Sequence, residues 1–162
     1  MPRKRTDTRK KVMSAAAAAA WRRARGRRGQ TVVFTNGVFD ILHPGHIRLL
    51  EAAAALGDAL ILGVNSDASA RGLGKSGPPR PVNRFADRAR VLAALACVDA
   101  VVAFREPTPA RLLSRLKPEI LVKGADYSPK QVAGREHAGK LVLLPLARGH
   151  STTGLLARLN AK

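Results

Sequence analysis

The chain has 162 residues, 46% of them hydrophobic and only 4% aromatic, so we expect one domain with an aliphatic core. Its single cysteine, Cys97, excludes an intrachain disulfide framework and is typical of a reduced, cytoplasmic protein. The formal net charge is +18, and no apolar run approaches the roughly 18 residues of a membrane span, so we expect no membrane-spanning segment.

The basic charge is concentrated at the N-terminus. Residues 1–30 hold eleven of the 29 Lys and Arg residues but only one acid, Asp7. We expect 1–11 to be disordered and the Ala-rich stretch 12–25 to form a helix. The chain is therefore divided into a basic arm, 1–29, and a domain, 30–162. The arm has three interpretations: a solvated tail without a partner, a targeting peptide, or a surface that binds nucleic acid or another polyanion.

From residue 31 onward, short apolar runs alternate with helical segments. Such alternation predicts βαβ units and a Rossmann-like, doubly wound parallel sheet of five strands. Ligands of such sheets bind at the carboxyl ends of the strands. The predicted strands are 31–35, 59–64, 100–103, 120–122 and 141–144, and the predicted helices are 46–56, 84–96, 108–116, 129–138 and 152–159.

The segment 35–46 follows the first predicted strand and carries the clearest chemical signal. Pro44 suits the first position of a helix and forces His43 into an extended conformation, while Gly45 lets a ligand approach the backbone. His46 then lies in the first turn, whose free N–H groups attract an anion. Two imidazoles there could stabilise the charge on a phosphate during its transfer. The alternatives are a capped surface turn or half of a zinc site, but no further His or Cys lies at zinc spacing.

The segment 70–81 contains two apparent phosphate-binding motifs that we reject. Its letters fit both G-x-G-x-x-G and the end of a P-loop, yet both motifs need a strand directly before and a helix directly after. Here the preceding strand ends near Val64, and prolines follow. We interpret the segment as a mobile basic loop whose Lys75 and Arg80 close on phosphates. The alternative is an exposed Gly/Pro loop with incidental charge.

Two later segments add polar groups. Lys123, Asp126 and Tyr127 follow a buried strand, which suits a phosphorylated polyol: the carboxylate accepts hydrogen bonds from hydroxyls and the ammonium faces charge. A turn that starts a helix is the alternative. Residues 151–154, Ser-Thr-Thr-Gly, are either an ordinary N-cap or a second helix N-terminus that binds nucleotide phosphates.

Taken together and in this order, these segments resemble one family. The resemblance extends over about residues 30–159 and is to the D-glycero-β-D-manno-heptose 1-phosphate adenylyltransferases, which belong to the cytidylyltransferase-like nucleotidyltransferases with an H-x-G-H box. That activity also occurs as the C-terminal half of a bifunctional kinase/adenylyltransferase. Because no sugar-kinase segment is present, we expect a stand-alone form. The segments that carry the resemblance are 36–43, 65–69, 80–83, 91–99, 122–127 and 151–154.

The resemblance implies transfer of AMP from ATP to heptose 1-phosphate, giving ADP-heptose for lipopolysaccharide or another surface glycan, and pyrophosphate. It also implies Mg²⁺ held mainly by ATP phosphates, with no protein metal site. The catalytic residues it implies are His43, His46 and Lys75. The nucleotide-binding residues it implies are Thr35, Asn36, Gly37, Phe39, Gly45, Arg88, Ser151, Thr152 and Thr153, and the sugar-phosphate-binding residues are Asp40, Arg80, Lys123, Asp126 and Tyr127.

Some features depart from the family pattern. Ala125 replaces a glycine, Arg148 stands where an acid is common, the loop 74–79 is long, and the arm has no family counterpart that the sequence identifies.

Two other functions stay open. One is a related enzyme such as a glycerol-3-phosphate cytidylyltransferase. The other is nucleic-acid binding through the arm. Two observations argue against it: aromatic residues are scarce, and no nucleic-acid-binding module is recognisable. A homodimer is also left open.

Overall fold

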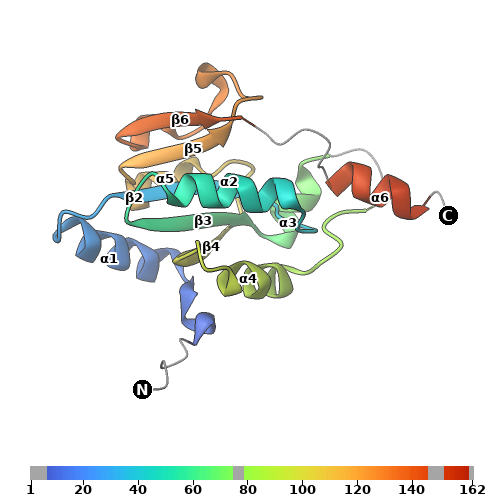
Figure 1. Cartoon of the computed structure of the whole chain (residues 1–162), viewed down its shortest axis with the longest axis horizontal. Helices are drawn as coiled ribbons and strands as arrows, with labels where there is room; N and C mark the ends of the chain where they lie inside the picture. The colour runs from blue at the N-terminus through green and yellow to red at the C-terminus, as the bar shows by residue number, and fades with distance from the viewer. Residues whose placement is uncertain (1–6, 75–78, 146–151, 161–162) are drawn as a thin grey trace.

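The computed structural model describes residues 7–74, 79–145 and 152–160 of the chain. Within these residues the fold is built on a six-stranded, all-parallel sheet with the order β1-β4-β3-β2-β5-β6 (Figure 1). The α/β fold with a parallel sheet is confirmed. The strands are β1 (Val12–Met13), β2 (Val32–Gly37), β3 (Ala59–Asn65), β4 (Ala100–Phe104), β5 (Ile120–Gly124) and β6 (Lys140–Leu144).

Helices cover both faces of the sheet. One core cluster packs α2 and α4 on one face, and a second packs α1 and α5 on the other. The alternation along β2 shows the division, since Val33 belongs to the first cluster and its neighbours Val32 and Phe34 to the second. The helices are α1 (Ala15–Gly26), α2 (Pro44–Ala54), α3 (Asp67–Gly72), α4 (Phe85–Ala94), α5 (Ala110–Leu116) and α6 (Thr152–Asn160), with the short 3₁₀ helices η1 (Thr8–Lys11), η2 (Pro129–Gln131) and η3 (Arg135–His137).

The sheet has one strand more than the sequence predicts. The extra strand is β1, in which Val12 and Met13 pair with Val101 and Val102 at the edge of β4. A two-residue strand has no detectable alternation of apolar and polar residues, so its pairing depends on β4 being in place. The helix that we predict at 12–25 accordingly begins only at Ala15, where Ser14 caps it by accepting from the N–H of Ala17.

The N-terminal residues that the structure describes pack on the domain. Ala18 and Ala19 of α1 are buried in the second core cluster, and the small alanine side chains allow close contact with α5 and the sheet. The ammonium of Lys11 donates to the carbonyls of Leu95 and Val98 beyond the end of α4. Residues 7–29 therefore do not form the solvated arm that their composition suggests; the remainder of the arm, 1–6, lies outside the described residues.

Two helix predictions differ from the structure. The helix predicted at 129–138 is wrong: η2 and η3 occupy the segment, separated by Gly134 in the left-handed region at φ 82°. A Cβ at Gly134 would lie 2.6 Å from Leu113 Cδ1, so glycine is needed for close packing on α5. The short helix α3 was not predicted; Ser66 caps it by accepting from the N–H of Ser69.

The strand order places a switch point at β2. From β2 the chain proceeds through β3 to β4, and it then returns to place β5 on the other side of β2. The loops that follow β2 and β5 therefore diverge, and a crevice opens at their carboxyl ends. This is the edge of the sheet where α2 begins.

Candidate active site

Two stacked histidines open helix α2. His43 is the N-cap in an extended conformation, and its Nδ1 accepts from the backbone N–H of His46 at 3.3 Å. The two imidazole rings stack with their centroids 3.8 Å apart, and Phe39 meets the ring of His46 edge-on at 5.3 Å. Phe39 lies at φ 47°, which turns the chain sharply between β2 and α2. The start of the helix thus presents both imidazoles at its positive end.

These histidines line a pocket of about 330 Å³ at the carboxyl ends of β2 and β5. The pocket brings together most of the residues that the sequence predicts. Those that line it are Thr35, Asn36, Gly37, Phe39, Asp40, His43, Gly45, His46, Arg80, Lys123, Asp126, Tyr127, Thr152 and Thr153. Val38, Leu49 and Ala70 line it as well and were not predicted, because apolar residues carry no chemical signal in a sequence.

The wall formed by β5 and its loop supplies a buried cation. Lys123 is only 9% exposed, and its ammonium lies 5.1 Å from the centre of the Tyr127 ring. Burial lowers the pKa of Lys123 from 10.5 to about 8, partly offset by the negative charge of Asp126. Thr35 ties this wall to β2 by donating from Oγ1 to the carbonyl of Val122 at 3.0 Å. Lys123 is thus held in the pocket and is still charged at neutral pH.

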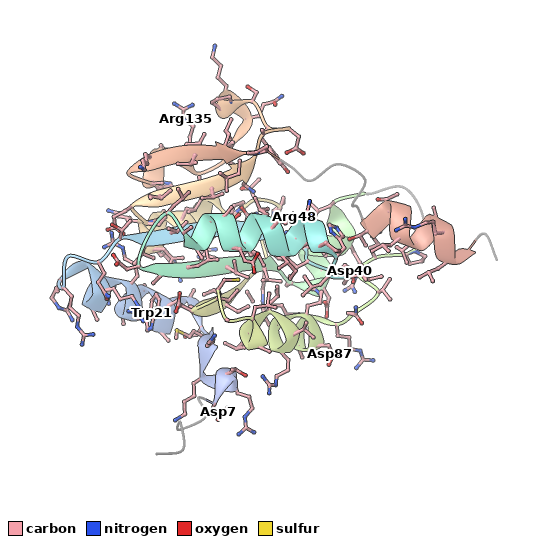
Figure 2. All side chains as sticks on the ribbon, in the orientation of Figure 1. Asp7, Trp21, Asp40, Arg48, Asp87 and Arg135 are labelled. Carbon is pink, nitrogen blue, oxygen red and sulfur yellow. The ribbon has the colours of Figure 1, made fainter. Side chains whose placement is uncertain are left out.

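Asp40 anchors the loop on the opposite side of the pocket. It lies at the N-terminal end of α2, on the side where α6 extends (Figure 2). Its carboxylate accepts from the backbone N–H groups of Val82 and Asn83, each at 2.9 Å, and its carbonyl accepts from Asn83 Nδ2. Asp40 therefore lines the pocket but also holds Val82 and Asn83 in the loop that carries Arg80. These hydrogen bonds position that loop.

Helix α6 closes the same side. The guanidinium of Arg80 donates to Thr153 Oγ1 at 3.0 Å, and Thr152 Oγ1 donates to the carbonyl of Ile41 at 3.4 Å. These contacts join the loop before α4, the start of α6 and the loop after β2. Two predicted residues, Lys75 and Ser151, and the departure at Arg148 lie outside the described residues.

Arg88 does not line the pocket, although we predicted that it binds nucleotide. It is 2% exposed, and its guanidinium donates to the carbonyls of Val38 at 2.6 Å, Asn65 at 2.9 Å and Asn83 at 3.0 Å. It also pairs with Asp67 Oδ1 at 2.8 Å. These partners take four of its five N–H donors. Arg88 thereby joins the ends of β2 and β3 to the loop that carries Arg80. Its role in this structure is to position the pocket walls.

The structure also limits other kinds of site. Among the residues it describes, no group of three or more His, Cys, Asp or Glu side chains could hold a metal ion. In the same ranges, no helix combines the length and apolar character needed to cross a membrane. The rejected phosphate-loop motifs stay rejected, since Gly72 ends α3 and does not follow a strand.

The chain is similar to known proteins over most of its length. It is 51% identical over 82% of its residues to the bifunctional protein HldE of Syntrophotalea carbinolica, and 52% identical over 93% to that of Mesorhizobium japonicum. It spans only about 30% of the length of these curated relatives, 28% and 31% respectively. Because this match covers 93% of the chain, it includes residues of α1.

Solved structures show the same fold. The lipopolysaccharide core biosynthesis protein from Thermoplasma volcanium is 29% identical with a TM-score of 0.63, over 74% of this chain and 99% of its own. The pantoate-beta-alanine ligase of Francisella tularensis is 17% identical with a TM-score of 0.59, over 85% and 67% respectively, and supports the fold alone. A family model described as Cytidylyltransferase-like matches residues 34–142, which include His43, His46 and Lys123. The chain therefore belongs to the cytidylyltransferase-like family.

Proposed function

We propose that this chain transfers AMP from ATP to heptose 1-phosphate, giving ADP-heptose and pyrophosphate. The observation that carries the proposal is the stacked pair His43 and His46 at the start of α2, in a pocket that also contains Arg80 and Lys123. Relatives named bifunctional protein HldE, about half identical to this chain, support the adenylyl-transfer assignment. We place the reaction in the cytoplasm, and the single, free Cys97 agrees with such a reducing compartment.

The chemistry needs no protein nucleophile. A phosphate oxygen of the sugar phosphate attacks the α-phosphorus of ATP, the new P–O bond forms, and the bond to pyrophosphate breaks in line. The protein has to hold the reactants and stabilise the charge that builds on the oxygens of the transferred group. Because His43 Nδ1 accepts from the N–H of His46, the proton of a neutral ring lies on Nε2, which can donate to a phosphate oxygen.

Cations on two walls complete the proposed binding of phosphates. Lys123, buried on the β5 side, would face the phosphate of the sugar. The resemblance assigns Arg80 to the sugar phosphate as well, but Arg80 donates to Thr153, one of the expected nucleotide-binding residues, so we propose that it faces the nucleotide. Asp126 beside Lys123 would accept hydrogen bonds from sugar hydroxyls. Because these groups come from two different segments of the pocket lining, they suit two phosphorylated substrates that meet at the histidines.

Mg²⁺ would be held in this pocket mainly by phosphate oxygens of the bound substrate. The carboxylates of the pocket, Asp40 and Asp126, could supply the one or two protein oxygens that Mg²⁺ usually takes beside phosphate oxygens and water. Because Asp126 is assigned to the sugar hydroxyls and Asp40 already accepts from two backbone N–H groups, phosphate oxygens and water would supply most of the ligands of the ion. When bound, Mg²⁺ would neutralise charge on the triphosphate.

Pyrophosphate release tests the proposal directly. The full chain is assayed with Mg²⁺ in four combinations, ATP or CTP with heptose 1-phosphate or glycerol 3-phosphate. Release with ATP and heptose 1-phosphate alone is the expected result. Release only with CTP and glycerol 3-phosphate would assign the chain to another branch of the family, and no release in any combination would overturn the proposal.

A histidine substitution tests the mechanism. His46→Ala is expected to lower turnover at least about 100-fold, because it removes a donor that stabilises developing charge. His137→Ala is the matched control, since His137 lies on η3 outside the pocket. Circular dichroism should show both variants folded. Turnover of His46→Ala equal to that of His137→Ala would contradict the assigned role.

A further inference from the structure

A second pocket of about 330 Å³ lies at the carboxyl end of β4, where β4 leads into α5. It shares none of its described lining residues with the active pocket. Its apolar lining includes Ala103 and Leu112, and its polar lining is mostly basic: Arg105, Arg111 and Arg115. This pocket has no part in the function proposed above.

The three guanidinium groups come from the end of β4 and from one face of α5. Arg105 is the first residue after β4, and Arg111 and Arg115 are four residues apart on α5, which puts them on one face of that helix. Helix α1 begins at Ala15, which also lines the pocket, and its described first turn carries no acidic residue. The positive end of α1 thus adds to the potential of the arginines.

One acid partly offsets this charge. Glu106 lines the pocket, and its carboxylate accepts from the backbone N–H of Arg105 at 3.0 Å and from Arg111 Nη1 at 3.4 Å. The side chains of Arg105 and Arg115 make no ion pair or hydrogen bond with any residue that the structure describes. Two guanidinium groups that line one concave surface are therefore not neutralised by the protein.

We propose that this pocket binds a small phosphorylated ligand, with its phosphate held by Arg105, Arg111 and Arg115. A phosphate offers several oxygens to the planar fork of donors on each guanidinium, and such charge-assisted bonds are stronger than neutral ones. The volume suits a ligand of the size of a nucleoside or sugar phosphate, whose body would contact Ala103 and Leu112. Inorganic phosphate shares the same chemistry and is the simplest probe.

Backbone amide shifts measured by NMR on the full, ¹⁵N-labelled chain test the proposal. Inorganic phosphate, AMP and glucose 1-phosphate are titrated separately, and the amides of 105–115 report this pocket while those of 43–46 report the active pocket. Saturable shifts at 105–115 are the expected result. Tighter binding of an organic phosphate than of inorganic phosphate would identify the source of the ligand. Shifts confined to 43–46 would overturn the proposal.

Paired variants separate this pocket from general basic charge. Arg105→Ala combined with Arg115→Ala is expected to weaken phosphate binding at 105–115 by about tenfold or more, since two charge-assisted contacts are lost. Arg23→Ala combined with Arg27→Ala removes the same charge from exposed positions on and just after α1, outside the pocket, and should leave the affinity nearly unchanged. Equal weakening in both double variants would refute a specific site.

A charge-conserving pair guards against a folding defect. Arg105→Lys combined with Arg115→Lys retains both positive charges but loses the planar donors, so binding should weaken by less than in the alanine pair. If the alanine pair does not fold, this variant decides the question. Affinity equal to that of the unaltered chain would contradict recognition by guanidinium. None of these measurements depends on the transfer activity.

Discussion

Arg88→Ala is the substitution from which we expect the largest loss of stability in this chain. The guanidinium of Arg88 is buried and connects the carbonyls of Val38, Asn65 and Asn83 with the carboxylate of Asp67. Alanine would remove all four contacts at once and leave a cavity between α4 and the ends of two strands.

The size of the effect follows from the exposure of the partners. A buried acceptor that loses its donor costs about 1–3 kcal/mol, and breaking a buried ion pair from one side costs about 3–5 kcal/mol. The side chain of Asp67 is 33% exposed, so water can replace part of the lost interaction. We therefore expect the free energy of unfolding to fall by about 3–5 kcal/mol, a large share of the roughly 5–15 kcal/mol of a typical domain.

Urea unfolding followed by circular dichroism measures this loss. Arg90→Ala is the matched control, because Arg90 lies on the same helix and is exposed. Among the residues that the structure describes, its side chain donates only to Thr8 Oγ1, at 2.6 Å. Such an exposed contact is worth less than about 1 kcal/mol. Arg88→Ala should also lower turnover where it is still folded, since the loop with Arg80 loses an anchor. Equal unfolding midpoints and slopes for the two variants would refute the reasoning.

The other predictions concern Lys123, Gly134 and the N-terminal segment. Lys123, with its pKa near 8, is charged below that pH and neutral above it, so the KM for the sugar phosphate should rise as the pH passes 8, and Lys123→Arg should abolish the rise. Since the unfolded chain keeps this proton up to a pKa of 10.5, Lys123 should contribute an increase in the free energy of unfolding between pH 8 and 10.5. Gly134→Ala should cost about 1–3 kcal/mol in urea unfolding because of its positive φ and the clash with Leu113, whereas Gly72→Ala, where a Cβ meets open space, should be nearly neutral. Deleting 1–29 should destabilise the domain and lower pyrophosphate release, since β1 and the buried face of α1 are lost; full stability of the truncated chain would show that this segment is dispensable.

The part of the site that depends on local sequence was predictable. The geometry at the start of α2 follows from Pro44 at the first position, His43 before it and His46 in the first turn, all within four residues. The fold class was also predictable, because alternating apolar strands and amphipathic helices allow few arrangements. These features rest on interactions between near neighbours, which the sequence displays directly.

What depends on distant contacts was not predictable. Arg88 has the sequence character of a phosphate ligand, and only the convergence of three loops shows that its donors are occupied. Residues 7–29 have the composition of a solvated arm, yet alanines that are weakly hydrophobic one by one fit closely against α5. The predicted helix at 129–138 fails because Gly134 is required for packing on Leu113, a contact that no local pattern shows.

The position of β1 has a consequence for the order of folding. Val12 pairs with Val101, whereas the central strand β2 pairs with β3, which follows it closely in the chain. During synthesis, β1 and α1 leave the ribosome before β4, so the place of β1 in the sheet does not exist until β4 has been made. Residues 12–26 therefore stay undocked, with the apolar side of α1 exposed, until the β2–β4 unit has assembled. The high positive charge of residues 1–30 would make undocked chains repel one another and so discourage aggregation before docking.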